Sequence, residues 1–219
     1  MKRLQLIFLL LIGWAIHVYP QDENAPDSSN QYIEDLTNLL TLRLYTLTKY
    51  NSLEIINPNG RMIMRPNGNT NIGVGFNYKS LGLGIAFGRP LSQSSIDKYG
   101  LTNRFDMQAS FYGKRIGLDG FIQWYKGYYM ANPDDFIDWD KPNYPHVRDL
   151  EIFSVGGNGY YLFNREKFSY KAAYLRNEIQ KRSTGSLSTG IFFYHDMVRS
   201  EKWVPAWQKC RTVSVQILI

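Results

Sequence analysis

The sequence predicts an all-β protein, an antiparallel up-and-down β-barrel of the outer-membrane type. Three observations lead to this fold class. The side chains on the two faces of one hairpin differ sharply in size and polarity. Tight and long connections alternate along the chain, and the N-terminus carries an export signal. The hairpin is the most informative of the three, because it says which side of the sheet needs apolar surroundings.

This hairpin covers residues 69–88. Bulky apolar residues occupy every second position of both arms: Ile72, Val74, Phe76, Tyr78, Leu81, Leu83, Ile85 and Phe87. The positions between them hold glycine, alanine, asparagine or lysine. A period of two is the period of a strand, and only Lys79 and Ser80 remain for the reversal. We expect the bulky row to face outward into lipid.

The chain begins with an export signal, since Lys2 and Arg3 precede a short apolar stretch. Residues 1–20 are therefore predicted to be a signal peptide, too short in its apolar part to favour a membrane-spanning helix. Residues 21–40 are predicted to form a linker followed by a short periplasmic helix, because apolar residues recur at helical spacing between residues 31 and 40. Residues 41–219 are predicted to form the barrel domain.

Further strands follow from the same alternation. Strand-like patterns occupy residues 41–56, 61–65, 104–112, 116–125, 153–163, 168–174 and 187–193. Asn57–Gly60 is a strong turn signal. Residues 88–103 and 127–149 are expected to be irregular, and Gly156, Gly157 and Gly159 are candidates for bulges or sharp bends. The pattern predicts eight to ten strands.

The connections support a barrel independently of the alternation. They are tight at Lys79 and Lys114 and short near Asn164, but long after Gly88 and Gly127. Outer-membrane barrels have short periplasmic turns and longer external loops. The chain also contains 16 Tyr, 12 Phe and 5 Trp, many near predicted strand ends, where interfacial girdles lie. The alternative is that these aromatic residues form the core of a soluble β-sandwich.

Charge and cysteine content exclude several classes of protein. Removing residues 1–20 takes two basic residues from 25 and leaves the 19 acidic ones, a formal charge of +4. No dense Lys/Arg run is present, so we expect no nucleic-acid partner. Cys210 is the single cysteine, which excludes an intrachain disulfide framework and a cysteine-based metal site.

Candidate chemistry is sparse. After the signal peptide only His146 and His195 remain, and His195 with Asp196 and the nearby serines is the one arrangement that a lipid-modifying enzyme could use. The acidic loop does not match the spacing of a calcium loop; it contains Asp134, Asp135, Asp138 and Asp140. We therefore expect no catalytic, cofactor-binding or metal-binding residues. Four basic residues are expected to line the lumen or meet lipopolysaccharide phosphates: Arg43, Lys126, Arg176 and Lys181.

Several long phrases carry a family resemblance. They are LTLRLYTLTKYNSLEI, PNGNTNIGVGFNYKSLGLGIAFG, KYGLTNRFDMQASFYGKRIGLDGFIQWYKGYY, NPDDF and FSYKAAYLRNEIQKRSTGSLSTGIFF. Over about residues 35–193 the chain resembles an uncharacterised family of exported Bacteroidetes proteins, known as a domain of unknown function. The resemblance implies an outer-membrane-like β-barrel in a Gram-negative envelope. It implies no activity and no catalytic residues.

The C-terminal end departs from that family pattern. Residues 201–211 lack alternation, although alternation returns over residues 212–219, and the last residue is Ile219 where a terminal barrel strand usually has an aromatic residue. We therefore expect residues 203–219 to be atypical and the barrel to be incomplete, through a truncation or frameshift after about Trp203.

The expected function is that of an uncharacterised, non-enzymatic outer-membrane barrel with a structural or small-solute-passing role. Its expected partners are outer-membrane lipid, lipopolysaccharide and the barrel-assembly machinery, and its expected location is the cell outer membrane. Two alternatives stay open: a lipid-modifying barrel enzyme, and a soluble periplasmic β-sheet protein that binds an apolar ligand.

Overall fold

The computed structural model describes residues 32–57, 60–90, 92–200 and 212–218. The predicted signal peptide and most of the stretch after Trp203 lie outside these residues. Within them, none of the helices has the length and apolar character needed to cross a membrane.

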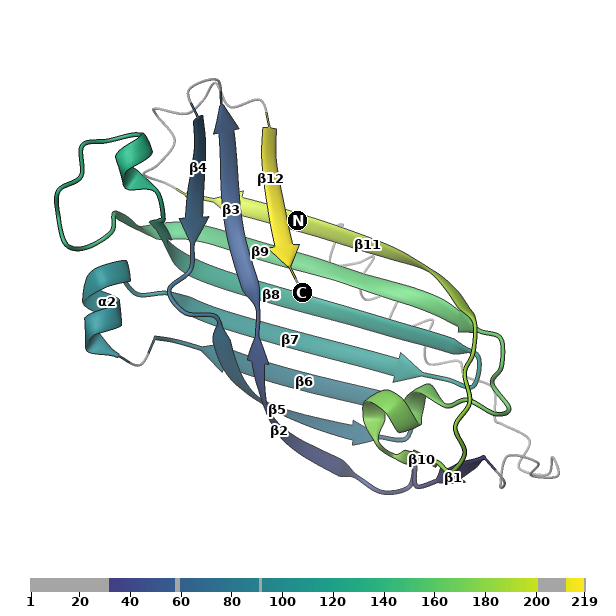
Figure 1. Cartoon of the computed structure of the whole chain (residues 1–219). Coiled ribbons are helices and arrows are strands. Elements are labelled where there is room, and N and C mark those ends of the chain that lie inside the picture. Colours follow the sequence, from purple (N-terminus) through teal and green to yellow (C-terminus); the bar gives the residue numbers. More distant parts are fainter. Residues whose placement is uncertain (1–31, 58–59, 91, 201–211, 219) are drawn as a thin grey trace, which may run out of the picture.

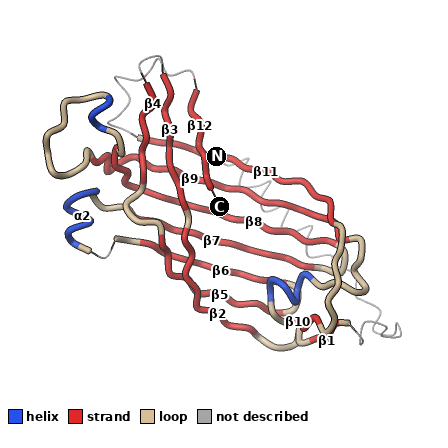
Figure 2. Tube along the Cα trace, in the orientation of Figure 1, coloured by secondary structure: helices blue, strands red, loops and turns tan. Residues whose placement is uncertain are grey.

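Long antiparallel strands form the main layer of the molecule (Figures 1 and 2). Their order across the sheet is β2-β5-β6-β7-β8-β9-β11, and each pairs antiparallel with the next. The bounds are Thr41–Thr48 (β2), Thr70–Tyr78 (β5), Leu81–Gly88 (β6), Asn103–Tyr112 (β7), Ile116–Met130 (β8), His146–Leu162 (β9) and Ser188–Arg199 (β11). The predicted hairpin at 69–88 is confirmed, with Val74 opposite Ile85.

Three shorter strands cross one face of this layer at a steep angle (Figure 1). They are β3 (Tyr50–Asn57), β4 (Gly60–Arg65) and β12 (Thr212–Leu218), in the order β12-β3-β4. β4 joins the end of β8 through the pairs Met64–Met130 and Arg65–Tyr129, which makes one ten-stranded sheet of the described strands. The turn predicted at Asn57–Gly60 is confirmed by the pairing of these two residues.

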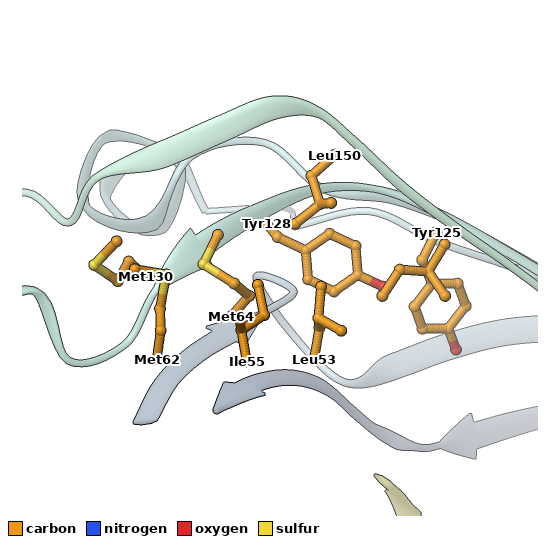
Figure 3. Close-up of a cluster of buried hydrophobic side chains, with 9 residues drawn as sticks. Leu53, Ile55, Met62, Met64, Tyr125, Tyr128, Met130 and Leu150 are labelled. Carbon is orange, nitrogen blue, oxygen red and sulfur yellow. The ribbon is translucent and has the colours of Figure 1, made fainter. Parts of the chain in front are cut away.

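The apolar core lies where the β3–β4 hairpin covers the main layer. Leu53 and Met64 of the hairpin pack with Tyr128 and Leu150 of β8 and β9, all four almost fully buried (Figure 3). The cluster is small, because elsewhere the covered face of the long sheet carries polar residues.

Smaller elements occupy the two ends of the layer. At one end lie a two-stranded sheet, β1 (Ile33–Asp35) with β10 (Glu178–Gln180), and the π-helix η3 (Lys171–Leu175). At the other end lie α2 (Gln93–Tyr99) and the 3-10 helix η2 (Pro133–Asp135). The tight turns at 79–80 and 113–115 lie at the η3 end (Figure 1).

The predicted helix in residues 21–40 is wrong for the part that the structure describes. Residues 33–35 form β1, which pairs with β10 in the register Ile33–Gln180, and residues 37–39 turn. The carboxylate of Asp35 accepts a hydrogen bond from the backbone N–H of Thr37 at 2.7 Å. A side chain that bonds the backbone two residues on stabilises a turn and competes with a helix.

The predicted strand at residues 168–174 is also wrong. This segment belongs to the long connection between β9 and β11, which the pattern around Asn164 predicted to be short. A compact turn brings the ring of Tyr170 within 6.0 Å of the ring of Tyr112 and 4.7 Å of that of Tyr160. Tertiary contacts of the aromatic rings therefore outweigh the local alternation.

Two predictions about irregular segments need correction as well. The segment predicted at 127–149 is shorter, since β8 runs to Met130 and β9 begins at His146. The register shift in this pair lies between Lys126 and Tyr128, where Gly127 has φ +90°, and the three candidate glycines of β9 pair without a shift. Helix α2 within residues 88–103 was not predicted.

The all-β fold class is confirmed, but the described strands do not close into a barrel. β2 and β11 are the two edges of the long layer. Because six successive antiparallel pairs separate them, these two edge strands run parallel to each other.

Candidate functional site

The strand registers sort the long sheet into tiers of side chains that run across the strands. On the outer face, the face away from β3 and β4, one tier contains one residue from each strand: Leu44, Val74, Ile85, Met107, Ile122, Val155 and His195. Large apolar side chains on this face are exposed, with 80% of Leu44 and 62% of Val74 accessible to solvent. The predicted outward direction of the bulky row is therefore confirmed.

An aromatic tier borders this apolar face near the α2 end. Phe87, Phe105, Trp124 and Phe153 are paired in that order on four adjacent strands. The rings of Phe87 and Phe105 have centroids 5.2 Å apart. Just beyond the tier, charged residues appear on the same face.

That charge is an ion pair between neighbouring strands. Lys126 of β8 pairs in register with Glu151 of β9, and Lys126 Nζ lies 3.9 Å from a carboxylate oxygen of Glu151. The outer face therefore changes from apolar to aromatic to charged along the strand direction.

The inner face, the face toward β3 and β4, has the opposite character. Outside the apolar cluster under β3 and β4, this face buries several polar side chains, among them Asn71, Asn77, Asp106, Gln123 and Ser154. Soluble proteins bury apolar side chains and expose polar ones. In the part of the sheet away from that cluster, the arrangement is reversed.

Asp106 is the centre of the buried polar groups. Its carboxylate accepts hydrogen bonds from Lys49 Nζ at 2.6 Å, from the Tyr125 hydroxyl at 3.1 Å and from the side-chain amide of Asn71. Lys49 lies between β2 and β3, where the chain leaves the long sheet. The ion pair therefore fixes this point of the chain to the inner face of the sheet.

Glycines make room on the inner face. One inner tier reads Arg43, Gly75, Gly84, Gln108, Phe121, Gly156 and Tyr194. A Cβ on Gly84 would lie 2.7 Å from the Tyr45 hydroxyl, and one on Gly156 would lie 2.6 Å from the Phe121 ring. The side chains of Tyr45 and Phe121 therefore lie directly against the glycine backbone. Because the glycines have no side chains of their own, space remains next to this tier on the inner side of the sheet.

This space is a cavity of about 340 Å³. Its polar lining includes Arg43, Gln108, Gln123 and Asp119, and its aromatic lining includes Phe121 and Tyr194. Asp119 accepts hydrogen bonds from the hydroxyls of Tyr112 at 2.6 Å and Tyr160 at 3.1 Å.

The η3 segment borders the cavity through Tyr174 and Leu175. Leu175 is buried and approaches Gly82 closely enough that a Cβ there would lie 2.7 Å from it. The backbone carbonyl of Leu175 accepts a hydrogen bond from the Asn77 side chain at 2.7 Å. We call residues 163–187, which contain η3 and β10, the plug segment.

The structure separates the one catalytic arrangement that the sequence allowed. His195 lies on the outer face in register with Val155, whereas Asp196 lies on the inner face and accepts a hydrogen bond from the Ser154 hydroxyl at 2.5 Å. Because adjacent residues of a strand point to opposite faces, the two side chains cannot act together. His146, at the start of β9, packs against Gly100 instead.

The predicted acidic loop forms no metal site in the described part of the chain. Asp134 and Asp135 belong to η2, and the Asp135 carboxylate accepts a hydrogen bond from Asn132 at 2.7 Å. Such a bond fixes the loop without any ion.

Of the four basic residues predicted to line the lumen or meet lipopolysaccharide phosphates, Arg43 lines the cavity. Lys126 lies on the outer face, Lys181 pairs with Glu34 at 3.4 Å, and Arg176 ends η3 in the left-handed conformation. The Lys49–Asp106 pair was missed. The one sequence signal for it was the polar row Arg104, Asp106 and Gln108, which does not reveal a partner 57 residues away.

A family model described as a domain of unknown function, DUF4421, matches residues 25–211 of the chain. No curated protein and no solved structure matches the chain.

Proposed function

The chain belongs to the DUF4421 family, and on that premise we propose that it is an outer-membrane β-barrel protein of a Gram-negative envelope, with a non-enzymatic structural or small-solute-passing role. The single observation that carries this proposal is the reversal of the two faces of the long sheet. Val74 is 62% exposed while its neighbours on the same strand, Gly73 and Gly75, are buried.

Lipid accounts for such a sheet better than water does. Exposing apolar surface to water costs about 25 cal/mol per Å². A continuous apolar face that extends over the seven strands of the long layer therefore marks an interaction surface. Burying Asn71 and Asp106 is tolerated because they are hydrogen-bonded to each other. An apolar outside and a polar inside is the arrangement of outer-membrane barrels.

The height of the apolar face supports the same role. On β8 it extends from Ile116 to Trp124, nine residues. At roughly 3.3 Å per residue this is about 30 Å of strand, and a tilted strand crosses the hydrocarbon core with roughly 9–11 residues. The tier of Phe87, Phe105, Trp124 and Phe153 corresponds to an interfacial girdle.

The connections suggest an orientation. In the proposed barrel the tight turns at 79–80 and 113–115, together with β1 and the plug segment, face the periplasm. Residues 92–102 and 131–145 then lie on the side of the cell exterior, where Lys126 and nearby basic groups meet lipopolysaccharide phosphates. Outer-membrane lipid and the barrel-assembly machinery are the partners that this proposal requires.

Closure of the barrel requires further pairing at β2 and β11. Since these two edges run parallel, an odd number of additional antiparallel strands would satisfy both. We include such closure in the proposal, because an open sheet edge is not tolerated in lipid.

Fractionation of the native host tests the proposal. We expect the protein to stay in the outer-membrane pellet after a carbonate wash, and to migrate faster unheated than boiled on a denaturing gel. Recovery of the folded protein in the soluble fraction would overturn it, and would mean that the outer face is covered by protein.

A further inference from the structure

We propose that the inner cavity binds a small molecule with one anionic group and a planar apolar body. The inference rests on the cavity itself and holds whether or not the outer face meets lipid. Its volume of about 340 Å³ lies at the lower end of the range for small-molecule sites, roughly 300–1,000 Å³.

The anionic group is inferred from Arg43, which lines the cavity. Among the described residues Arg43 has no hydrogen-bond or ion-pair partner, and its Nε is buried. Its guanidinium lies 5.8 Å from the centroid of the Tyr45 ring, a contact that leaves its N–H groups free. A cation held in a half-buried site without a counter-charge is a ready partner for a carboxylate or similar anion.

The other basic groups of the inner face are already used. Lys49 is paired with Asp106 at 2.6 Å, and Arg104 donates to the backbone carbonyls of Asn67 and Thr70 at 3.2 and 2.9 Å. Arg43 therefore differs from both of them.

Neutral donors accompany Arg43 in the cavity. Gln108 lies in the same tier as Arg43, and Gln123 lies in the next tier. Neither side-chain amide has a hydrogen-bond partner in the described part of the chain, although Gln123 is 4% exposed. Such amides supply the hydrogen bonds that orient a ligand in its site.

A cationic ligand is disfavoured by the hydrogen bonds of Asp119, the one carboxylate among the described residues that line the cavity. Asp119 already accepts bonds from Tyr112, from Tyr160 and, at 3.4 Å, from the amide of Asn158. An incoming cation would have to displace these donors, whereas an incoming anion would displace nothing from Arg43.

The planar body is inferred from the walls. Phe121 and Tyr194 have ring centroids 5.7 Å apart, and Tyr174 lines the cavity from the plug segment. Aromatic walls favour flat ligands, which can stack or pack edge to face. Gly75, Gly84 and Gly156 of the inner tier have no side chains that would project into the cavity, so a flat ligand can lie across the strands.

Calorimetric titration of the purified, folded protein with naphthalene-2-carboxylate tests the inference. The neutral control is 2-naphthamide, which has the same planar body, and the non-planar control is octanoate. We expect the native protein to bind the carboxylate about tenfold or more tightly than the amide, because hydrogen bonds to a charged group are the stronger ones. We also expect octanoate to bind more weakly than naphthalene-2-carboxylate.

Two variants locate the effect. Arg43→Gln should remove the preference for carboxylate over amide, while Lys126→Gln, which removes the same charge from the outer face, should keep it. Equal affinity of the native protein for carboxylate and amide would overturn the anionic part, whatever the variants do, and so would an unchanged preference in Arg43→Gln. Octanoate binding as tightly as naphthalene-2-carboxylate would overturn the planar part. The calorimetric result does not depend on where the protein lies in the host cell, which fractionation measures. The ligand inference and the proposed function can therefore be overturned independently of each other.

Discussion

Lys49 Nζ lies 2.6 Å from Asp106 Oδ1, and both side chains are almost fully buried. The pair joins the break between β2 and β3 to the inner face of β7, and it holds the crossing hairpin against the long sheet. Asp106 also accepts hydrogen bonds from Asn71 and Tyr125, so its charge is satisfied from three sides.

Removing one member of this pair should be strongly destabilising. We expect Asp106→Ala to lower the free energy of unfolding by about 3–5 kcal/mol, because it leaves the Lys49 ammonium buried without a partner. The double variant Lys49→Met with Asp106→Leu should recover most of the loss. Urea unfolding of the purified protein measures both, and a double variant as unstable as Asp106→Ala would show that the charge is not the cause.

A charge on the outer face distinguishes lipid from water. Val74 lies midway along β5 on that face and is already 62% exposed, so a soluble protein would tolerate Val74→Arg with little change. A lipid-facing position near the membrane midplane should instead lose about 2–4 kcal/mol. The measurement is the fraction of the variant that assembles in the outer membrane with the fast gel mobility of the folded form.

Thr70→Arg is the matched control for Val74→Arg. Thr70 lies on the same strand and the same face, but beyond the tier of Phe87, at the level expected for lipid headgroups. We expect it to assemble normally. Equal assembly of both variants would argue that lipid does not contact this face.

Glycine on the inner face is required by close approach rather than by a turn. A Cβ on Gly73 would lie 2.6 Å from the Tyr45 ring, 2.7 Å from the Ala86 Cβ and 2.8 Å from the Ile85 carbonyl oxygen. Gly73→Ala should therefore cost about 1–3 kcal/mol through overpacking. Urea unfolding provides the measurement.

Gly120 offers a control within the same sheet. It lies on the outer face of β8, and the nearest atom to its added Cβ is the Gly156 carbonyl oxygen at 3.8 Å. Gly120→Ala should leave stability unchanged or raise it by up to about 1 kcal/mol, since alanine loses less conformational entropy than glycine. A comparable loss in both variants would mean that glycine is needed for flexibility and not for space.

The sequence predicted the long strands well because their alternation is local. In β5 every outward residue from Ile72 to Tyr78 is large, so each position independently indicates the same face. The direction of Arg43 toward the interior follows from the same rule. These features need no knowledge of distant residues.

The remainder depends on contacts between distant segments. Alternation at residues 168–174 resembles a strand, yet rings from β7 and β9 draw Tyr170 into a compact turn. The crossing of β3 and β4 over the sheet depends on Lys49 and Asp106 meeting, and β1 depends on β10, far along the chain. Local patterns carry no information about such pairs.

The plug segment is held to the sheet by two asparagines, and this gives a test by proteolysis. Asn77 of β5 donates to the Leu175 carbonyl at 2.7 Å, and Asn177 donates to the Lys79 carbonyl. Removing one such bond costs about 1 kcal/mol. If the plug segment opens locally before cleavage, that loss should raise the population of the open form about fivefold. We therefore expect Asn77→Ala to accelerate trypsin cleavage at Lys171 and Lys181 by that factor, as followed by mass spectrometry under native conditions.

The specificity of this effect is checked by a second inner-face asparagine and by a distant cleavage site. Asn158→Ala removes only the 3.4 Å contact with Asp119 and should leave cleavage of the plug segment unchanged. Cleavage at Lys98, in α2, should be the same in all three proteins because α2 lies at the other end of the sheet (Figure 1). Faster cleavage at Lys98 in Asn77→Ala would indicate global loosening, and the plug segment would then not be a separately opening unit.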